Sequence, residues 1–431
     1  MTPEVRKRIE QVRCGSVPVG YKKGELGIAP EEWDEVSFST LFTSTSEYTE
    51  DLERYPLYSL TIEHGITAKT ERYERSHLVK KENSYKIVRP NDYAYNPMNI
   101  RFGAVARHKG TVPVAVSGYY DIFTTTHESD LDFMDSFLTC GPMITYYNKV
   151  STGSLIEKQR VHFSDFMEFV LVLPPLNERK NIAEILTTQD RVIELKEKRL
   201  SEKLRQKKYL MQQLLTGKKR LPGFRGEWEQ MGFDQVFTFG ATNTFSRECM
   251  CEDSADVKNI HYGDILVKYE EVLKLSEQEI PSLLSDIGSK ITTFVDDGDI
   301  VIADTAEDLT AGKVVEVRDT QNKKVAAGLH TMLCKPIKGC FAPGWLGYYM
   351  NSEYYHKQLI PYIAGVKVMS ISKGNIVKTH ILVPSLEEQT AIAEVLFAAD
   401  REIELLRQDI GQERQKKKAL MQILLTGIVR V

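Results

Sequence analysis

Cysteine is scarce in this chain of 431 residues. The six cysteines are scattered along it, at Cys14, Cys140, Cys249, Cys251, Cys334 and Cys340. This pattern excludes a small disulfide-stabilised scaffold, because such scaffolds place cysteines densely in a short chain. Cys249 and Cys251 form half of a metal-binding pattern, but no second Cys or His pair follows at the spacing of a zinc site. We expect reduced thiols and no metal site.

Long hydrophobic runs are also absent. Residues 169–173 are typical of the longest runs, far below the ~20 residues that cross a bilayer. The first 13 residues carry four basic side chains without an apolar segment behind them, so no signal peptide is predicted. These absences predict a cytoplasmic protein without a membrane partner.

Motifs of nucleotide-using and methyl-transferring enzymes are missing. Ala311-Gly312-Lys313 lacks the earlier glycine of a phosphate loop and is followed by valine. Asn96-Pro97-Met98-Asn99 lacks the second proline and the aromatic ring of a methyltransferase corner, and we predict a turn there. Glu194-Leu195-Lys196 has the Glu-x-Lys spacing of some nucleases, but it lies in a predicted helix, where ion pairing or solvation is expected. The chain is therefore predicted to be non-catalytic.

One segment of the chain occurs twice. Residues 174–217 align without a gap on residues 384–427, and 21 of the 44 positions are identical. A shorter echo, Glu32-Trp33 and Glu227-Trp228, opens each unit. The sequences between these landmarks show little similarity. A fixed frame that presents two different modules fits this pattern, since a duplicated catalytic domain would be expected to repeat its reactive residues.

Both copies of the repeat carry a heptad pattern. The seam residues are Ile182, Leu186, Gln189, Ile193, Lys196, Leu200, Leu210 and Leu214 in the first copy, and Ile392, Leu396, Ala399, Ile403, Leu406, Ile410, Leu420 and Leu424 in the second. Proline precedes and glycine follows each segment. The pattern predicts two helices of about 38 residues, each roughly 57 Å long.

The two seams are expected to bury each other. Pseudo-two-fold symmetry then predicts an antiparallel coiled coil with one globular block at either end. The helix length equals about one and a half turns of DNA at ~34 Å per turn, which suits two half-sites on one duplex. An ordinary dimerisation coiled coil is the alternative that heptads alone leave open. The helix lysines, Lys207, Lys208 and Lys416 to Lys418, are expected to be solvated.

The globular blocks, residues 1–173 and 221–383, contain strand-like runs separated by turns. Strands are predicted within residues 85–88, 111–117, 260–267 and 299–303, and helical stretches are fewer. The predicted fold class is α+β, with two globular domains and two long helical regions at residues 174–220 and 384–431. Loops of a curved sheet would carry the contacts of each block.

Candidate contacts with DNA are basic and polar side chains, because arginine pairs bidentately with guanine and lysine attracts phosphate. In the first block they are Arg72, Arg75, Lys80, Arg101, Arg107, Lys109, Arg160 and His162. In the second block they are His261, Lys268, Lys290, Lys313, Lys367, Ser370, Ser372 and Lys373. The segments 160–162 and 367–370 are preferred, because they precede the repeated helix at equivalent positions.

The charge distribution restricts how DNA could be bound. The chain has a net charge of -4, and only the first helical region is basic, with 13 basic and 6 acidic side chains between residues 177 and 220. Residues 1–176 and 221–385 carry net charges of -4 and -6. Any contact of the blocks with phosphate must therefore use local clusters of lysine and arginine.

Motifs at the ends of the repeated segments resemble those of one protein family. Gly20-Tyr21-Lys22-Lys23 stands ahead of Glu32-Trp33, each helix opens with Pro-x-Leu-x-Glu and Arg or Gln, and each closes with Leu-Met-Gln-x-Leu-Leu-Thr-Gly. In these motifs and in its duplication the chain resembles the specificity subunits of Type I restriction-modification systems. The resemblance covers essentially the whole chain as two target-recognition domains and two conserved helical regions.

The resemblance implies a function in sequence recognition. Each recognition domain would read one half of a split site in double-stranded DNA, and the helices would set the unread spacer. Two modification subunits would bring S-adenosylmethionine and methylate adenine, while restriction subunits would bring ATP- and Mg-dependent translocation and cleavage. No cofactor is expected in this chain. The alternatives are the specificity subunit of a Type II-like or orphan system, and a coiled-coil scaffold that does not bind DNA.

Overall fold

The chain forms two compact units. The computed structural model describes residues 2–68, 84–155, 158–252, 256–321 and 323–431. Unit 1 comprises the residues up to 197 together with 408–431, and unit 2 comprises residues 198–407. Each unit therefore combines one globular block with the beginning of one long helix and the end of the other. Among the described residues, no helix is both long and apolar enough to span a membrane.

Unit 1 is an α+β structure. Its strands are β1 (Tyr21–Gly24), β2 (Gly27–Pro30), β3 (Asp34–Ser37), β4 (Phe42–Thr45), β5 (Tyr48–Thr49), β6 (Tyr58–Thr61), β7 (Gly65–Ala68), β8 (Tyr85–Val88), β9 (Tyr93–Tyr95), β10 (Val105–Arg107), β11 (Val114–Ser117), β12 (Asp121–Thr125) and β13 (Val170–Leu173). Its shorter helices are α1 (Pro3–Arg13), α2 (Phe38–Leu41), η2 (Ile100–Phe102), η3 (Glu128–Asp130), α3 (Leu131–Phe137), α4 (Gly141–Val150) and α5 (Phe163–Met167).

The core of unit 1 lies between an antiparallel sheet and short helices. The sheet has the order β10-β9-β12-β4, and a second sheet has the order β11-β8-β5. Phe123 of β12 stacks on Tyr93 of β9 with ring centroids 5.1 Å apart, and it lies 5.4 Å from Phe166 of α5. These rings are fully buried and join the sheet to α5. Burial of aromatic rings contributes much of the stability of such a core.

Unit 2 has a related architecture. Its strands are β14 (Glu229–Gly232), β15 (Phe237–Gly240), β16 (Met250–Cys251), β17 (Val257–Ile260), β18 (Val272–Lys274), β19 (Ser282–Leu283), β20 (Ile300–Ala303), β21 (Thr305–Ala306), β22 (Val314–Arg318), β23 (Lys324–Ala327), β24 (Thr331–Pro336), β25 (Ala364–Gly365), β26 (Met369–Ser370) and β27 (His380–Val383). Its shorter helices are α7 (Phe233–Val236), η5 (Arg247–Cys249), α8 (Tyr262–Val267), α9 (Ser285–Gly288), α10 (Trp345–Met350), α11 (Glu353–Leu359), η6 (Ile360–Tyr362) and α12 (Lys373–Ile376).

The central sheets of the two units correspond strand by strand. The sheet of unit 2 has the order β15-β24-β20-β22-β18, so β15, β24, β20 and β22 match β4, β12, β9 and β10. The pairing registers define the match: Ile122 with Thr45 and Asp121 with Tyr95 in unit 1, and Leu333 with Gly240 and Met332 with Ile302 in unit 2. In both units a strand pair also joins the beginning of the block to its end, β3 with β13 and β14 with β27.

Most predicted local elements of the blocks are confirmed, and one is wrong. Strands occupy residues 85–88, 114–117 and 300–303, and residues 96–99 form a turn in which the side chain of Asn96 accepts hydrogen bonds from two backbone N–H groups. Residues 260–267 are not one strand, because β17 ends at Ile260 and α8 begins at Tyr262. His261 is the cause: its Nδ1 accepts a hydrogen bond from the N–H of Gly263 at 3.2 Å and caps the helix.

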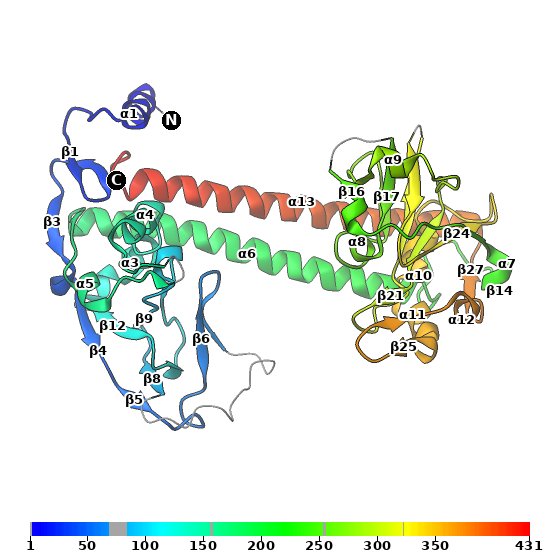
Figure 1. Cartoon of the computed structure of the whole chain (residues 1–431), viewed down its shortest axis with the longest axis horizontal. Helices are drawn as coiled ribbons and strands as arrows, with labels where there is room; N and C mark the ends of the chain where they lie inside the picture. Colours follow the sequence, from blue (N-terminus) through cyan, green and yellow to red (C-terminus); the bar gives the residue numbers. More distant parts are fainter. Residues whose placement is uncertain (1, 69–83, 156–157, 253–255, 322) are drawn as a thin grey trace. The chain divides into compact units, whose positions relative to one another are not determined.

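The predicted long helices are confirmed. α6 (Leu176–Leu214) and α13 (Leu386–Leu424) each contain 39 residues and run alongside each other (Figure 1). Gly217 and Gly427 follow them with φ of 68° and 67°, a left-handed conformation that glycine adopts without strain. Seam residues such as Ile182, Leu186 and Leu396 are fully buried. The heptad pattern thus identified the buried face.

Ion pairs show that the helices are antiparallel within each unit. In unit 1, Lys417 pairs with Asp190 at 2.5 Å and Lys196 with Asp409 at 2.8 Å. The partner number falls as the number along α6 rises, which defines an antiparallel pair. In unit 2, Lys203 pairs with Glu402 at 2.8 Å, and the buried Lys207 pairs with Asp400 and Glu271, both at 2.6 Å. The prediction that Lys207 is solvated is therefore wrong, because its position faces both α13 and the globular block.

A tryptophan, a glutamate and an arginine form the same cluster in both units. In unit 1, Glu178 at the start of α6 accepts hydrogen bonds from Trp33 Nε1 at 3.0 Å and from Arg430 Nε at 2.6 Å. In unit 2, the corresponding residues are Glu388, Trp228 and Arg220, with distances of 3.0 and 2.5 Å. We call each trio the Trp-Glu-Arg clamp. It ties the block, the start of one helix and the segment after the other helix.

Candidate nucleic-acid interface

Loops at one end of each central sheet converge in the same way. In unit 1 the N–H of Val161 donates to Pro97 O at 3.1 Å, and in unit 2 the N–H of Ile371 donates to Asp304 O at 2.9 Å. The turn between β11 and β12 and the turn between β23 and β24 lie at the same strand ends, because the registers are equivalent. We call these loops the strand-end rim: residues 97–98, 118–120 and 160–162 in unit 1, and residues 304–305, 329–331 and 370–372 in unit 2.

Several predicted contact residues lie on the strand-end rim. In unit 1, Arg160 is half-buried, and His162 is exposed at the N-terminus of α5. In unit 2, Ser370 is exposed in β26 and Ser372 precedes α12. Lys373, the first residue of α12, places its ammonium 5.1 Å from the ring centroid of Phe239. Because Arg160 and Ser370 occupy equivalent positions, the two rims present different polar groups on the same backbone frame.

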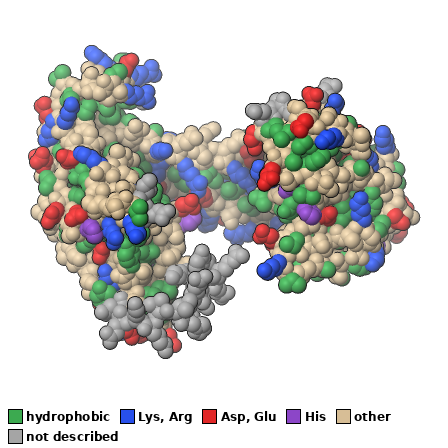
Figure 2. Space-filling model, in the orientation of Figure 1, with side chains coloured by type: hydrophobic (Ala, Val, Ile, Leu, Met, Phe, Trp, Pro, Cys, Tyr) green, Lys and Arg blue, Asp and Glu red, His purple; other side chains and the backbone are tan. Residues whose placement is uncertain are grey.

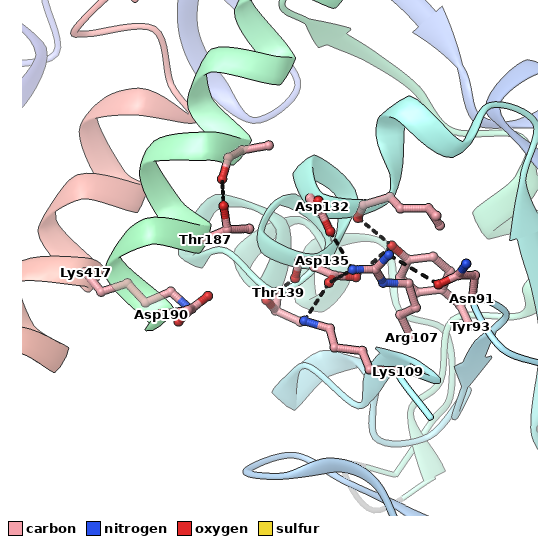
Figure 3. A network of polar contacts seen from close by, with 12 residues as sticks. Asn91, Tyr93, Arg107, Lys109, Asp132, Asp135, Thr139, Thr187, Asp190 and Lys417 are labelled. Carbon is pink, nitrogen blue, oxygen red and sulfur yellow. Dashed lines mark hydrogen bonds and ion pairs between the residues drawn. The ribbon is translucent and has the colours of Figure 1, made fainter. Parts of the chain in front are cut away.

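Two predicted residues of unit 1 lie at the opposite end of its central sheet. Arg107 from β10 pairs with Asp132 at 2.6 Å and Asp135 at 2.9 Å, and Lys109 pairs with Asp135 at 2.8 Å (Figure 3). They line a hollow of about 580 Å³ beside the β6–β7 hairpin. Arg107 is thus largely neutralised, whereas the exposed Lys109 keeps more freedom to approach a phosphate.

The remaining predicted residues are dispersed. Some are engaged with protein groups: Arg101 is buried against Gln159, His261 caps α8, Lys268 pairs with Asp264, and Lys313 donates to the carbonyls of Leu266 and Tyr269. Burial lowers the pKa of Lys313. Lys290 and Lys367 are exposed. Arg72, Arg75 and Lys80 lie outside the described residues. On the face seen in Figure 2, basic and acidic side chains are interspersed.

Tyr119 and His330 were not selected from the sequence, although they occupy the turns of the two rims. Tyr119 is 46% exposed, and the side chain of His330 is 49% exposed. Basic charge and closeness to the repeated helix were the features that predicted contacts with DNA, and a tyrosine or histidine in a turn in the middle of a block has neither. Alignment of the two blocks by strand register, which the sequence alone does not supply, makes these positions visible.

One strand position shows how the blocks diverged inside a common frame. Arg107 and Glu316 are equivalent, because the strands β10 and β22 that carry them form matching backbone bonds to the turns at residues 91–92 and 298–299. Arg107 faces the carboxylates of α3, whereas the buried Glu316 accepts hydrogen bonds from the N–H groups of Gly344 and Gly347. The same strand position therefore holds a basic residue in unit 1, paired with α3, and an acidic residue in unit 2, hydrogen-bonded to the start of α10.

Glu316 is expected to make the stability of unit 2 depend on pH. Burial raises the pKa of this carboxyl to about 7. The protonated Glu316 contributes its full stabilisation below pH ~4.5, and this contribution is lost as the pH rises through 7. The reason is that between these two pH values only the folded state holds the proton. Between pH ~4.5 and 7, the unfolding free energy of the natural protein should fall by roughly 3 kcal/mol relative to that of Glu316→Gln. Urea unfolding measures this, and Glu279→Gln, an exposed control, should leave the profile unchanged.

Comparison with known proteins identifies relatives of the chain. Residues 226–413 match the family described as the Type I restriction modification DNA specificity domain. The Type I restriction enzyme MjaVIII specificity subunit of Methanocaldococcus jannaschii is 28% identical over 62% of this chain and 63% of that subunit. The putative MjaX specificity subunit of the same organism is 23% identical over 95% of this chain and 97% of its own length. The match to MjaVIII thus spans less than two thirds of that relative.

Solved structures support the fold. A chain from a study of assembly and conformational transition of the Type I system superposes with a TM-score of 0.57 at 14% identity, covering 93% of this chain and 99% of its own. The S subunit of the Type I restriction-modification system from M. genitalium gives a TM-score of 0.52 at 11% identity, covering 94% and 99%. Residues 226–413 thus match the DNA specificity domain of Type I systems, and over nearly its whole length the chain is similar in sequence to Type I specificity subunits and in fold to these solved structures.

Proposed function

We propose that the chain is the non-catalytic DNA-recognition subunit of a Type I restriction-modification complex. Unit 1 reads one half of a bipartite target and unit 2 reads the other. The observation that carries this proposal is the contrast between the two repeats: the Trp-Glu-Arg clamps and helix ends are the same, whereas the strand-end rims present different side chains. A constant frame with variable loops is the arrangement that two different sequence readers require.

The long helices would set the spacing between the two half-sites. Their antiparallel pairing is supported by ion pairs within each unit. A helix of 39 residues is about 58 Å long at 1.5 Å per residue, so the spacer between half-sites is one to two helical turns of DNA. Lys109 and Lys367 are the exposed basic residues that we assign to phosphate, with Arg160, His162, Ser370 and Ser372 facing base edges.

Chemistry would come from partner subunits. Two modification subunits would carry S-adenosylmethionine and methylate adenine, and restriction subunits would use ATP and Mg²⁺ for translocation and cleavage. The net negative charge of both blocks supports assisted binding, because a subunit that holds phosphate mainly by itself would be expected to carry a basic face.

A block exchange tests the proposal. Residues 33–174 are replaced by the corresponding block of a specificity subunit with a different known target, and the chimera is expressed with its methylase partner. Methylome sequencing should then show a new sequence in one half of the split motif, while the other half stays unchanged. Exchange of residues 228–384 is the matched control and should change only the other half. A motif that ignores both exchanges would refute the proposal.

A further inference from the structure

Tyr119 and His330 occupy equivalent positions in the two units. Tyr119 lies two residues before Asp121, which pairs with Tyr95 of the central strand. His330 lies two residues before Met332, which pairs with Ile302 of the corresponding strand. Both residues therefore lie in the turn that enters the equivalent inner strand of the central sheet, β12 in unit 1 and β24 in unit 2. Each belongs to the strand-end rim and each carries an exposed polar ring.

The backbone of His330 is held in an unfavourable conformation. Its φ is 53°, in the left-handed region that residues with a Cβ rarely occupy. The turn is fixed by its neighbours, because the hydroxyl of Thr331 donates to Gly328 O at 2.6 Å and the N–H of Asp304 donates to His330 O at 3.1 Å. Strain of this kind persists where the surrounding structure imposes it, often at functional sites. Glycine would relieve it, yet the position holds histidine.

The side chain of His330 is oriented by three groups of its own unit. Its Nδ1 lies 3.4 Å from the hydroxyl of Thr305 and 3.6 Å from Asp304. That hydroxyl donates to Asp304 at 2.7 Å, so it accepts from Nδ1–H of the imidazole. The ring of Tyr262 packs edge-on against the imidazole with centroids 5.3 Å apart. The Nε2 atom has no hydrogen-bond partner within the described part of the chain and remains an acceptor in the neutral ring.

The turn of unit 1 is supported differently. The N–H of Tyr119 donates to the hydroxyl of Ser117 at 3.3 Å, and the buried Lys86 donates to Tyr120 O at 2.8 Å. The hydroxyl of Tyr119 likewise has no partner among the described residues. A phenol donates and accepts, whereas a neutral imidazole held by Nδ1 only accepts through Nε2. The two equivalent positions therefore have different hydrogen-bonding capacities, which is what two different half-sites require.

We propose that Tyr119 and His330 are equivalent specificity-determining residues, each contacting the edge of one base pair in the half-site of its own unit. His330 accepts through Nε2 a hydrogen bond from the exocyclic amine of adenine or cytosine in the major groove. This proposal rests on the proposed function and names the residues that act within it.

The decisive variant is His330→Gly, assayed as the complete complex with the methylase partner. Glycine removes the ring and relieves the positive φ, so the thermal stability should stay the same or rise. Methylation rates on duplexes varied one base pair at a time should show about fivefold to tenfold weaker discrimination at one position of a single half-site. Tyr119→Ala should weaken discrimination at one position of the other half-site.

Lys338→Ala is the matched control. β24 separates the two residues: His330 immediately precedes the strand, and Lys338 lies two residues after its other end, away from the rim. Lys338→Ala should leave the discrimination unchanged at every position of both half-sites. Unchanged discrimination in both His330→Gly and Tyr119→Ala would overturn the inference. If the block exchanges alter half-sites while these two variants do not, the residue assignment fails and the proposed function stands; if the exchanges also fail, both fall.

Discussion

Replacing Glu388 by alanine is expected to destabilise unit 2 by about 3 kcal/mol, because it removes the buried acceptor of three hydrogen bonds and leaves the partly exposed Arg220 without its carboxylate partner. The side chain of Glu388 is only 1% exposed. Its two oxygens accept hydrogen bonds from Arg220 Nε and Nη2, both at 2.5 Å, and from Trp228 Nε1 at 3.0 Å. Loss of the carboxylate therefore leaves three hydrogen-bond donors without their acceptor. Urea unfolding followed by peptide-resolved hydrogen exchange would locate the loss in unit 2.

The neighbouring residue supplies the control for this experiment. Glu387 is exposed in the first turn of the same helix, so Glu387→Ala should change the unfolding free energy by less than about 1 kcal/mol. Glu178→Ala should reproduce the effect of Glu388→Ala in unit 1, because the same trio recurs there. If Glu388→Ala unfolds with the free energy of Glu387→Ala, the clamp does not stabilise the unit.

The clamp also shows what sequence patterns could and could not predict. The seam residues Ile392 and Leu396 are buried as the heptads indicated, because local periodicity reports the buried face of a helix. Contacts between Trp33 and Glu178, 145 positions apart, depend on how the chain folds back and have no local pattern. A signal did exist, since Arg220 and Arg430 follow the two repeats at the same offset. These arginines lie just after the repeated segments, which end at Gly217 and Gly427.

The predicted contacts with DNA show a second kind of information that sequence patterns do not contain. His261 was predicted within a strand-like run, residues 260–267, and as a contact with DNA, but its side chain caps a helix that begins directly after β17. Cationic residues such as Arg107 were selected for their charge, yet the structure commits Arg107 to two carboxylates. Charge alone does not distinguish a group available to phosphate from one that holds its own fold. That distinction requires the partners, and the partners come from distant elements.

Two lysines at the same position of the repeat should respond very differently to substitution. Lys207 and Lys417 are related by the repeat, and each pairs with the aspartate of the opposite helix, Asp400 or Asp190. The side chain of Lys207 is 9% exposed and also pairs with Glu271, whereas that of Lys417 is 26% exposed. Burial alone would lower the pKa of Lys207, but the two carboxylates outweigh it and raise the pKa. The ammonium is therefore held charged inside the structure.

Lys207→Met is expected to cost about 3–5 kcal/mol, because it leaves two carboxylates facing each other without a cation. Lys417→Met should cost about 1 kcal/mol or less, since its pair is partly solvated. Urea unfolding measures both free energies. Adding Asp400→Asn and Glu271→Gln to Lys207→Met should restore most of the loss, as removing all the charges of a buried cluster costs far less than removing one sign. Equal losses in the two single variants, or no recovery in the triple variant, would mean that burial of the charge cluster does not set the difference between the repeats.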